Sequence, residues 1–161
     1  MDIPGGVTIT IEGSLVKAKG PKGESQKQFR VRNVSIKSDG KKVEVECADP
    51  AVKGTVEAHI RNLVKGVQEG YVRKMKMIYA HFPFTLETKG DTLMVKNMLG
   101  EKLPRKFKII GKTKIEVKGQ EVTISGPSKD DVGQTIANMK TALKIREKDP
   151  RVFQDGIYEV A

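Results

Sequence analysis

The sequence predicts an α+β fold of two tandem, similar domains, each a small, mostly antiparallel sheet covered by one helix. Three observations lead to this prediction. The chain repeats itself internally, each copy opens with the alternating apolar and polar residues of half-buried strands, and each copy closes with apolar residues at helical spacing. The predicted domains are residues 1–81 and 82–161.

The internal repeat is visible at one constant shift along the chain. The matched pairs are Gly40 with Gly119, Val43 with Val122, Val45 with Ile124, Gly54 with Gly133, Ala58 with Ala137, Ile60 with Met139 and Val64 with Leu143. A turn, a strand and a helix face all recur, so the same faces should be buried in both copies.

Each copy opens with a predicted hairpin. The alternating segments are residues 7–11 and 15–17 in the first copy and 84–87 and 93–95 in the second. Turn-forming residues lie between them, at 12–14 and 89–92. A further strand pair is predicted around residues 39–40 and, in the second copy, around 118–119.

One amphipathic helix is predicted in each copy. The first runs from about residue 50 to 69, where Gly70 ends it. The second carries Asp130 and Asp131 in its first turn, where the helix dipole favours acids, and should end near Arg146. Residues 71–78 alternate and are predicted as a strand leading from the first domain towards the second.

The composition is that of a polyanion binder. Thirty Lys and Arg oppose twenty Asp and Glu, which gives a net charge of +10 and a pI of about 9.7. The sequence contains no long apolar run and no signal-peptide pattern, so a cytoplasmic protein without a membrane partner is expected. Cys47 is the only cysteine, which excludes an intrachain disulfide.

The sequence offers no converging groups for catalysis, so no enzymatic activity, no metal and no cofactor are predicted. His59 and His81 belong to no metal-binding or triad pattern. The glycine-rich loops at 19–23 and 125–129 match no nucleotide-binding motif. For the first loop an ordinary turn and a phosphate contact stay equally open; for the second, a turn with a helix cap is favoured.

Two basic stretches are the candidate binding surface, one between residues 96 and 118 and one between 140 and 151. Phosphates suit such clusters because neutralising them releases counterions. No RNP1 aromatic set, zinc finger or helix-turn-helix is visible, which favours folded, double-helical RNA recognised by shape. The alternatives are an RNA-processing enzyme or nuclease with a basic surface, and a protein-binding adaptor.

Three segments, in order, resemble the universal large-subunit ribosomal protein six family in its archaeal and eukaryotic form. They are residues 3–7 with 16–24 and Phe29, residues 97–102 with Pro104 and Arg105, and residues 148–158. The resemblance departs at the end, because members of this form usually continue with a few basic residues where this sequence has Glu159, Val160 and Ala161.

The resemblance implies a structural constituent of the large ribosomal subunit with two similar α+β domains. It implies large-subunit rRNA and neighbouring ribosomal proteins as partners, with translational GTPases docking nearby at the sarcin–ricin loop. The implied rRNA-binding residues are Lys102, Arg105, Lys106, Lys112, Lys114, Lys129, Lys144, Arg146, Lys148 and Arg151. Phe153, Ile157 and Tyr158 are expected to anchor the tail, and Gly156 to serve backbone geometry.

Overall fold

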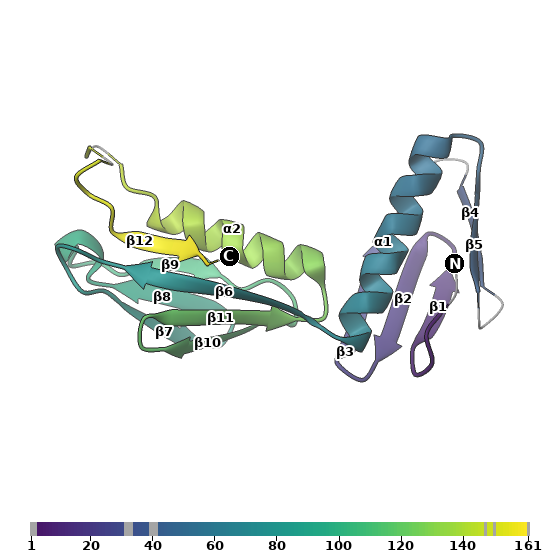
Figure 1. The fold of residues 1–161 in the computed structure, drawn as a ribbon, viewed down its shortest axis with the longest axis horizontal. Coiled ribbons are helices and arrows are strands. Elements are labelled where there is room, and N and C mark those ends of the chain that lie inside the picture. Colours follow the sequence, from purple (N-terminus) through teal and green to yellow (C-terminus); the bar gives the residue numbers. More distant parts are fainter. Residues whose placement is uncertain (1–2, 31–33, 39–41, 147, 150, 161) are drawn as a thin grey trace. The chain divides into compact units, whose positions relative to one another are not determined.

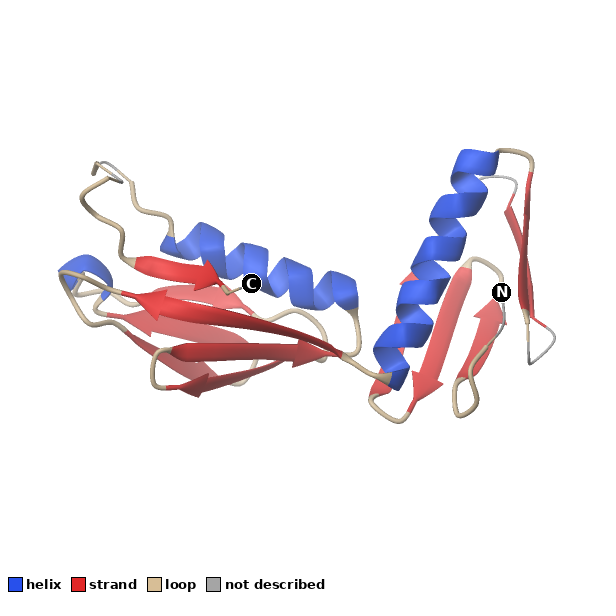
Figure 2. Ribbon diagram, in the orientation of Figure 1, coloured by secondary structure: helices blue, strands red, loops and turns tan. Residues whose placement is uncertain are grey.

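The computed structural model describes residues 3–30, 34–38, 42–146, 148, 149 and 151–160. The chain forms two compact units: the first holds Met1–Tyr71 with Gly126–Lys129, and the second holds Val72–Ser125 with Asp130–Ala161. Along the chain, three strands, a strand pair, a helix and one more strand follow each other, and the same order then recurs (Figures 1 and 2). The predicted α+β fold with two tandem domains is confirmed.

The first unit contains two small antiparallel sheets and a helix. One sheet has the order β1 (Thr8–Glu12), β2 (Leu15–Gly20), β3 (Gly23–Gln28), and the other pairs β4 (Val34–Ser38) with β5 (Val43–Cys47). On β5, buried Val43 and Val45 alternate with exposed Glu44 and Glu46, as the sequence predicts. The turn predicted around residue 40 lies outside the described residues.

Helix α1 (Pro50–Gln68) begins where its first turn is capped. The Asp49 carboxylate accepts a hydrogen bond from the Ala51 amide at 2.9 Å, and Pro50 fills a position that needs no amide donor. The helix packs against β2, β3 and β5. Its buried side chains include Val56, Ile60, Leu63, Val64 and Val67, which join the valines of β2 and β5 in one core.

Gly66 lets the segment before the second helix pack closely on α1. A side-chain carbon at Gly66 would collide with the carbonyl oxygen of Pro127 and would lie 2.9 Å from the Tyr71 ring. This close approach explains why Gly126–Lys129 belongs to the first unit although the residues on either side of it belong to the second.

The second unit contains two sheets and a helix. The three-stranded sheet has the order β7 (Thr85–Lys89), β8 (Thr92–Lys96), β9 (Arg105–Lys108), with a short 3-10 helix, η1 (Met98–Gly100), between β8 and β9. The four-stranded sheet has the order β10 (Lys114–Lys118), β11 (Glu121–Gly126), β6 (Tyr71–Ile78), β12 (Gly156–Glu159). Strands β3, β9 and β12 were not predicted from the sequence.

Strand β6 departs from the predicted organisation, which placed residues 71–78 in a first domain of residues 1–81. The strand lies between β11 and β12 in the second unit's sheet. Met77 donates its amide to the Gln120 carbonyl at 2.8 Å and pairs with Ile157, and Met75 and Met77 are buried. The two compact units therefore divide between Tyr71 and Val72, not between residues 81 and 82.

Helix α2 (Lys129–Leu143) carries Asp130 and Asp131 in its first turn, as predicted. Its buried side chains are Val132, Thr135, Ile136, Met139 and Leu143. The helix ends before the predicted position near Arg146. At this end, Arg105 Nη1 donates to the carbonyl of Ala142 in the last turn and to the carbonyl of Lys144 just beyond the helix.

Candidate nucleic-acid interface

Of the ten basic residues implied to bind rRNA, nine are exposed and Arg105 is half-buried. Along the chain, Lys102 follows η1, and Arg105 and Lys106 open β9. Lys112 precedes β10, which Lys114 opens, and Lys129 opens α2. Lys144 and Arg146 follow α2, and Lys148 and Arg151 precede β12. All belong to the second unit except Lys129, which belongs to the first.

The chain from Arg105 to Gly111 follows α2 in the opposite direction. Three hydrogen bonds fasten it to the helix: Arg105 Nη1 to the Ala142 carbonyl at 2.9 Å, Asn138 Nδ2 to the Lys108 carbonyl at 3.3 Å, and the Ile110 amide to Thr135 Oγ1 at 3.1 Å. At the far end, Gly111 lies against the Asp131 side chain. A helix of 15 residues is about 22 Å long, so Arg105 and Gly111 mark the two ends of that length.

One basic group lies at the carboxyl end of α2. Arg105, Lys144 and Arg146 line a pocket of about 370 Å³ together with Thr141 and Ala142. This pocket lies where α2 stops, and the last carbonyls of a helix carry partial negative charge that favours cations. The structure thus brings together side chains from β9 and from the segment after α2.

Arg105 has several protein partners in this group. Its Nε donates to Glu101 Oε2 at 2.8 Å, its Nη2 binds Glu101 Oε1, and its Nη1 donates to the carbonyls of Ala142 and Lys144. The hydrogen bond from Arg105 holds the pKa of Glu101 below its ordinary value, although partial burial opposes this, and Lys148 adds a smaller electrostatic effect. The same hydrogen bond raises the pKa of Arg105. Both groups are therefore charged near neutral pH.

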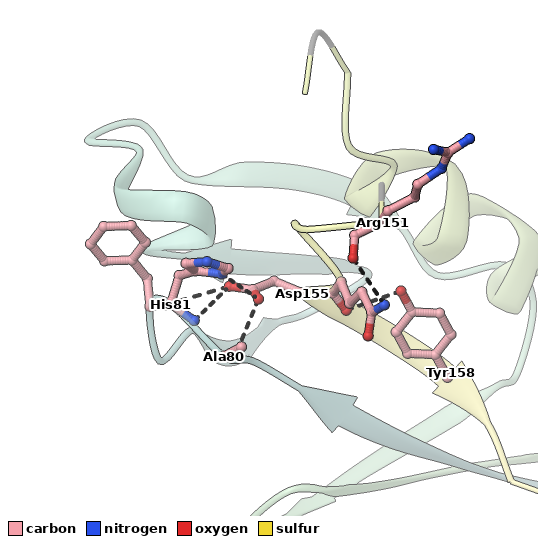
Figure 3. Close-up of polar contacts among 7 residues, drawn as sticks. Ala80, His81, Arg151, Asp155 and Tyr158 are labelled. Carbon is pink, nitrogen blue, oxygen red and sulfur yellow. Dashed lines mark hydrogen bonds and ion pairs between the residues drawn. The ribbon is translucent and has the colours of Figure 1, made fainter. Parts of the chain in front are cut away.

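The exposed cations Lys144, Arg146, Lys148 and Arg151 lie on one stretch of chain after α2, the basic segment. Asp155 fastens the carboxyl-terminal side of this segment to the sheet (Figure 3). Its carboxylate is only 1% exposed and accepts the Ala80 amide at 2.9 Å and the His81 and Phe82 amides at 3.4 Å. Burial works to raise the pKa of Asp155, but the hydrogen bonds from these three residues together outweigh it and leave the pKa below its ordinary value. A charged carboxylate thus ties the chain after β6 to the start of β12.

Phe153 packs against the His81 ring and the Lys148 ammonium. The His81 ring stacks on it with centroids 4.8 Å apart, and the Lys148 ammonium lies 4.6 Å from its centroid. His81 Nδ1 also lies 3.4 Å from Asp155 Oδ1. The exposed residues of the basic segment are therefore carried by a chain anchored at Lys144, Phe153 and Asp155.

The sequence matches the family model for ribosomal protein L6 over residues 3–70 and 82–156. The chain belongs to the ribosomal protein L6 family. It is 44% identical over 164 residues to the large ribosomal subunit protein uL6 of Methanocella arvoryzae, covering 98% of this chain and 93% of that one. It is 48% identical to the protein of that name from Methanosphaera stadtmanae, covering 98% and 89%. The corresponding protein of Archaeoglobus fulgidus is 42% identical, with 99% and 87% covered.

The carboxyl-terminal signature of this L6 chain has a clear structural basis. Ile157 is buried and pairs with Met77 across the sheet, so it anchors the tail as expected. Tyr158 is 47% exposed, and its hydroxyl donates to the Gln154 carbonyl at 3.1 Å (Figure 3). A side-chain carbon at Gly156 would lie 3.3 Å from the Tyr158 ring. Gly156 therefore leaves room for that ring, and its φ is not in the left-handed region.

Two further implied residues of the L6 chain, Lys112 and Lys114, form a second basic group of its second unit, whereas Lys129 belongs to the first unit. Lys112 follows Gly111, which lies against Asp131 of the first helical turn. Two further cations, Lys74 and Lys76, alternate with buried Met75 on β6 and are exposed in the second unit. Neither lysine was among the implied rRNA-binding residues; their alternation with Met75 and Met77 is the signal in the sequence that marks them as exposed.

The histidines of the L6 chain have ordinary structural partners. His59 Nδ1 lies 3.1 Å from Lys27 Nζ, and its ring lies 6.1 Å from that of Phe29. Within the described residues, no group of three or more His, Cys, Asp or Glu side chains could hold a metal ion. Neither α1 nor α2, the α-helices of the described chain, is long and apolar enough to cross a membrane.

Proposed function

We propose that this L6-family chain is a structural, non-enzymatic constituent of the large ribosomal subunit that binds rRNA through its second unit. The observation that carries this proposal is the basic group beyond α2, comprising Lys144, Arg146, Lys148 and Arg151. These side chains are exposed, and their segment is fastened by Arg105 on one side and Asp155 on the other. Relatives more than 40% identical over nearly the whole chain are named as large-subunit proteins.

The proposed chemistry is the neutralisation of phosphates by cations held in fixed positions. Each neutralised phosphate releases counterions, and such contacts set the position of a protein on RNA without reading its sequence. The second group, Lys112 and Lys114, follows Gly111 near the other end of a helix about 22 Å long, and Lys102, Lys106 and, in the first unit, Lys129 complete the proposed set. Two groups at this separation suit the phosphates of a folded RNA better than a single bound phosphate.

The proposed partners are large-subunit rRNA and neighbouring proteins of the subunit. The family resemblance supports two finer proposals, a position near the sarcin–ricin loop and proximity to translational GTPases. The proposed location is the large subunit of cytoplasmic ribosomes.

The experiment is a salt series of binding to the cognate rRNA fragment. The variant replaces the four cations beyond α2, Lys144, Arg146, Lys148 and Arg151, by Gln. Binding should weaken, and the slope of log affinity against log salt should flatten by up to about 2.8 to 3.6 units, at about 0.7 to 0.9 per lost phosphate contact.

A matched control removes four exposed cations of the first unit, Lys37, Lys42, Lys53 and Arg61. It carries the same net charge as the test variant, so it separates position from overall charge. We expect it to bind more tightly than the test variant and to keep a steeper slope. The opposite ranking would show that the RNA contacts the first unit.

A further inference from the structure

The pair formed by Arg105 and Glu101 has a role that the basic character of this region does not suggest. Arg105 is one of the residues implied to contact RNA, yet its side chain is only 23% exposed. A guanidinium has five N–H donors. Hydrogen bonds to Glu101 and to the carbonyls of Ala142 and Lys144 use its Nε, Nη1 and Nη2. Little donor capacity is left for a phosphate.

The carbonyls that Arg105 binds are those that a helix leaves without partners at its end. Ala142 belongs to the last turn of α2, and Lys144 is the first residue beyond the helix. A cationic side chain that binds such carbonyls stabilises the helix end. By holding both carbonyls at once, Arg105 sets the direction in which Lys144 and Arg146 leave the helix.

We infer that Arg105, held by Glu101, is a positioning residue that orients the basic segment after α2 and does not itself bind phosphate. This inference rests on the proposed function. An acid beside a phosphate-binding surface would ordinarily oppose RNA binding. Here Glu101 orients the guanidinium fork, because a carboxylate matches it in a bidentate pair.

Glu101→Gln is the most decisive test, because the two possible roles of Arg105 predict opposite changes in RNA affinity. If Arg105 bound phosphate, removing the competing acid would free the guanidinium and raise the net charge, so RNA would bind more tightly. If Arg105 positions the segment, Glu101→Gln should weaken binding severalfold despite the added net positive charge. Glu87→Gln is the matched control, because Glu87 is an acid of the same unit in an exposed pair with Lys96. It should not weaken binding.

Arg105 itself gives two further outcomes. Arg105→Gln should weaken binding because the basic segment must then be ordered when it binds, but the same phosphates are contacted and the salt slope should stay unchanged. Lys144→Gln removes a phosphate contact and should flatten the slope by about 0.7 to 0.9. Arg105→Lys should bind as poorly as Arg105→Gln, because an ammonium cannot replace the fork. Tighter binding by Glu101→Gln, or a slope that falls in Arg105→Gln, would overturn the inference.

Hydrogen exchange in the free protein separates this inference from the proposed function. Arg105→Gln should lower amide protection in the last turn of α2 and at Lys144, while protection in β11 is retained. Unchanged protection there overturns the positioning role even if wild-type protein binds RNA. Absence of salt-dependent RNA binding by wild-type protein overturns the proposed function, and this inference with it.

Discussion

Replacing Asp155 tests whether one buried carboxylate holds the second unit together. The carboxylate is 1% exposed and accepts amides from Ala80, His81 and Phe82, which follow β6. Asp155→Ala leaves these amides without their acceptor. Asp155→Asn keeps the shape and one oxygen acceptor but loses the charge.

The expected loss follows from the three amide distances. A hydrogen bond to a charged group contributes about 1.5 to 3 kcal/mol. The Ala80 amide at 2.9 Å should contribute a value in this range, and the two contacts at 3.4 Å should contribute less. We therefore expect Asp155→Ala to lower the free energy of unfolding by about 3 kcal/mol and Asp155→Asn by about half as much. For a unit of this size, 3 kcal/mol corresponds to a fall in Tm of about 12 to 24 °C.

The pH dependence gives an independent check. The pKa of Asp155 in the folded chain lies below its ordinary value of 3.8, so the unfolded chain takes up the proton first as the pH falls. The stabilisation should be complete well above pH 3.8 and should disappear as the pH falls through the folded pKa. The difference in free energy of unfolding between wild type and Asp155→Asn should therefore shrink from neutral pH to about pH 3.

These effects would be measured by urea unfolding monitored through hydrogen exchange of the amides in β6 and β12. Two outcomes would refute the reasoning. One is a loss below about 0.5 kcal/mol for Asp155→Ala, the size typical of a surface substitution. The other is a difference between wild type and Asp155→Asn that stays constant with pH, which would mean that the charge of Asp155 does not matter.

The remaining predictions concern how the units divide. A fragment of residues 72–161 should unfold cooperatively in urea. A fragment of residues 82–161 should not, because it lacks β6 with the buried Met75 and Met77. Equal cooperativity of the two fragments would contradict this prediction. Val45→Asp should abolish protection in the first unit and Ile124→Asp in the second, because an unpaired buried charge costs several kcal/mol. Equal loss of protection across both units in either variant would show that they unfold as one.

The sequence predicts those elements whose pattern is local. The opening hairpins, the strand pairs and both helices follow from alternation or helical spacing within a few residues. Strand β3 escapes this reasoning because it runs Gly-Glu-Ser-Gln-Lys-Gln, and only Ser25 in it is buried. A polar edge strand has no apolar alternation to reveal it.

Partnerships between distant segments are what the sequence does not reveal. The charge of Arg105 is evident from the sequence, and its position among lysines suggests that it binds RNA. Its actual partners include carbonyls 37 and 39 residues away. Backbone carbonyls are present at every position, so no residue type marks those that will accept a side chain.

Strand β6 shows how a duplicated sequence can give unequal units. The strand after the helix of each copy, β6 after α1 and β12 after α2, enters the same sheet of the second unit. There β6 is an interior strand with neighbours on both edges, so hydrogen bonds to both sides hold it more firmly than an edge position would. Asp155 then ties the residues just after β6 to the residue just before β12. The first copy thus supplies part of the sheet that anchors the proposed RNA-binding segment, and a substitution in residues 72–81 should affect RNA binding even though the internal repeat assigns them to the first copy.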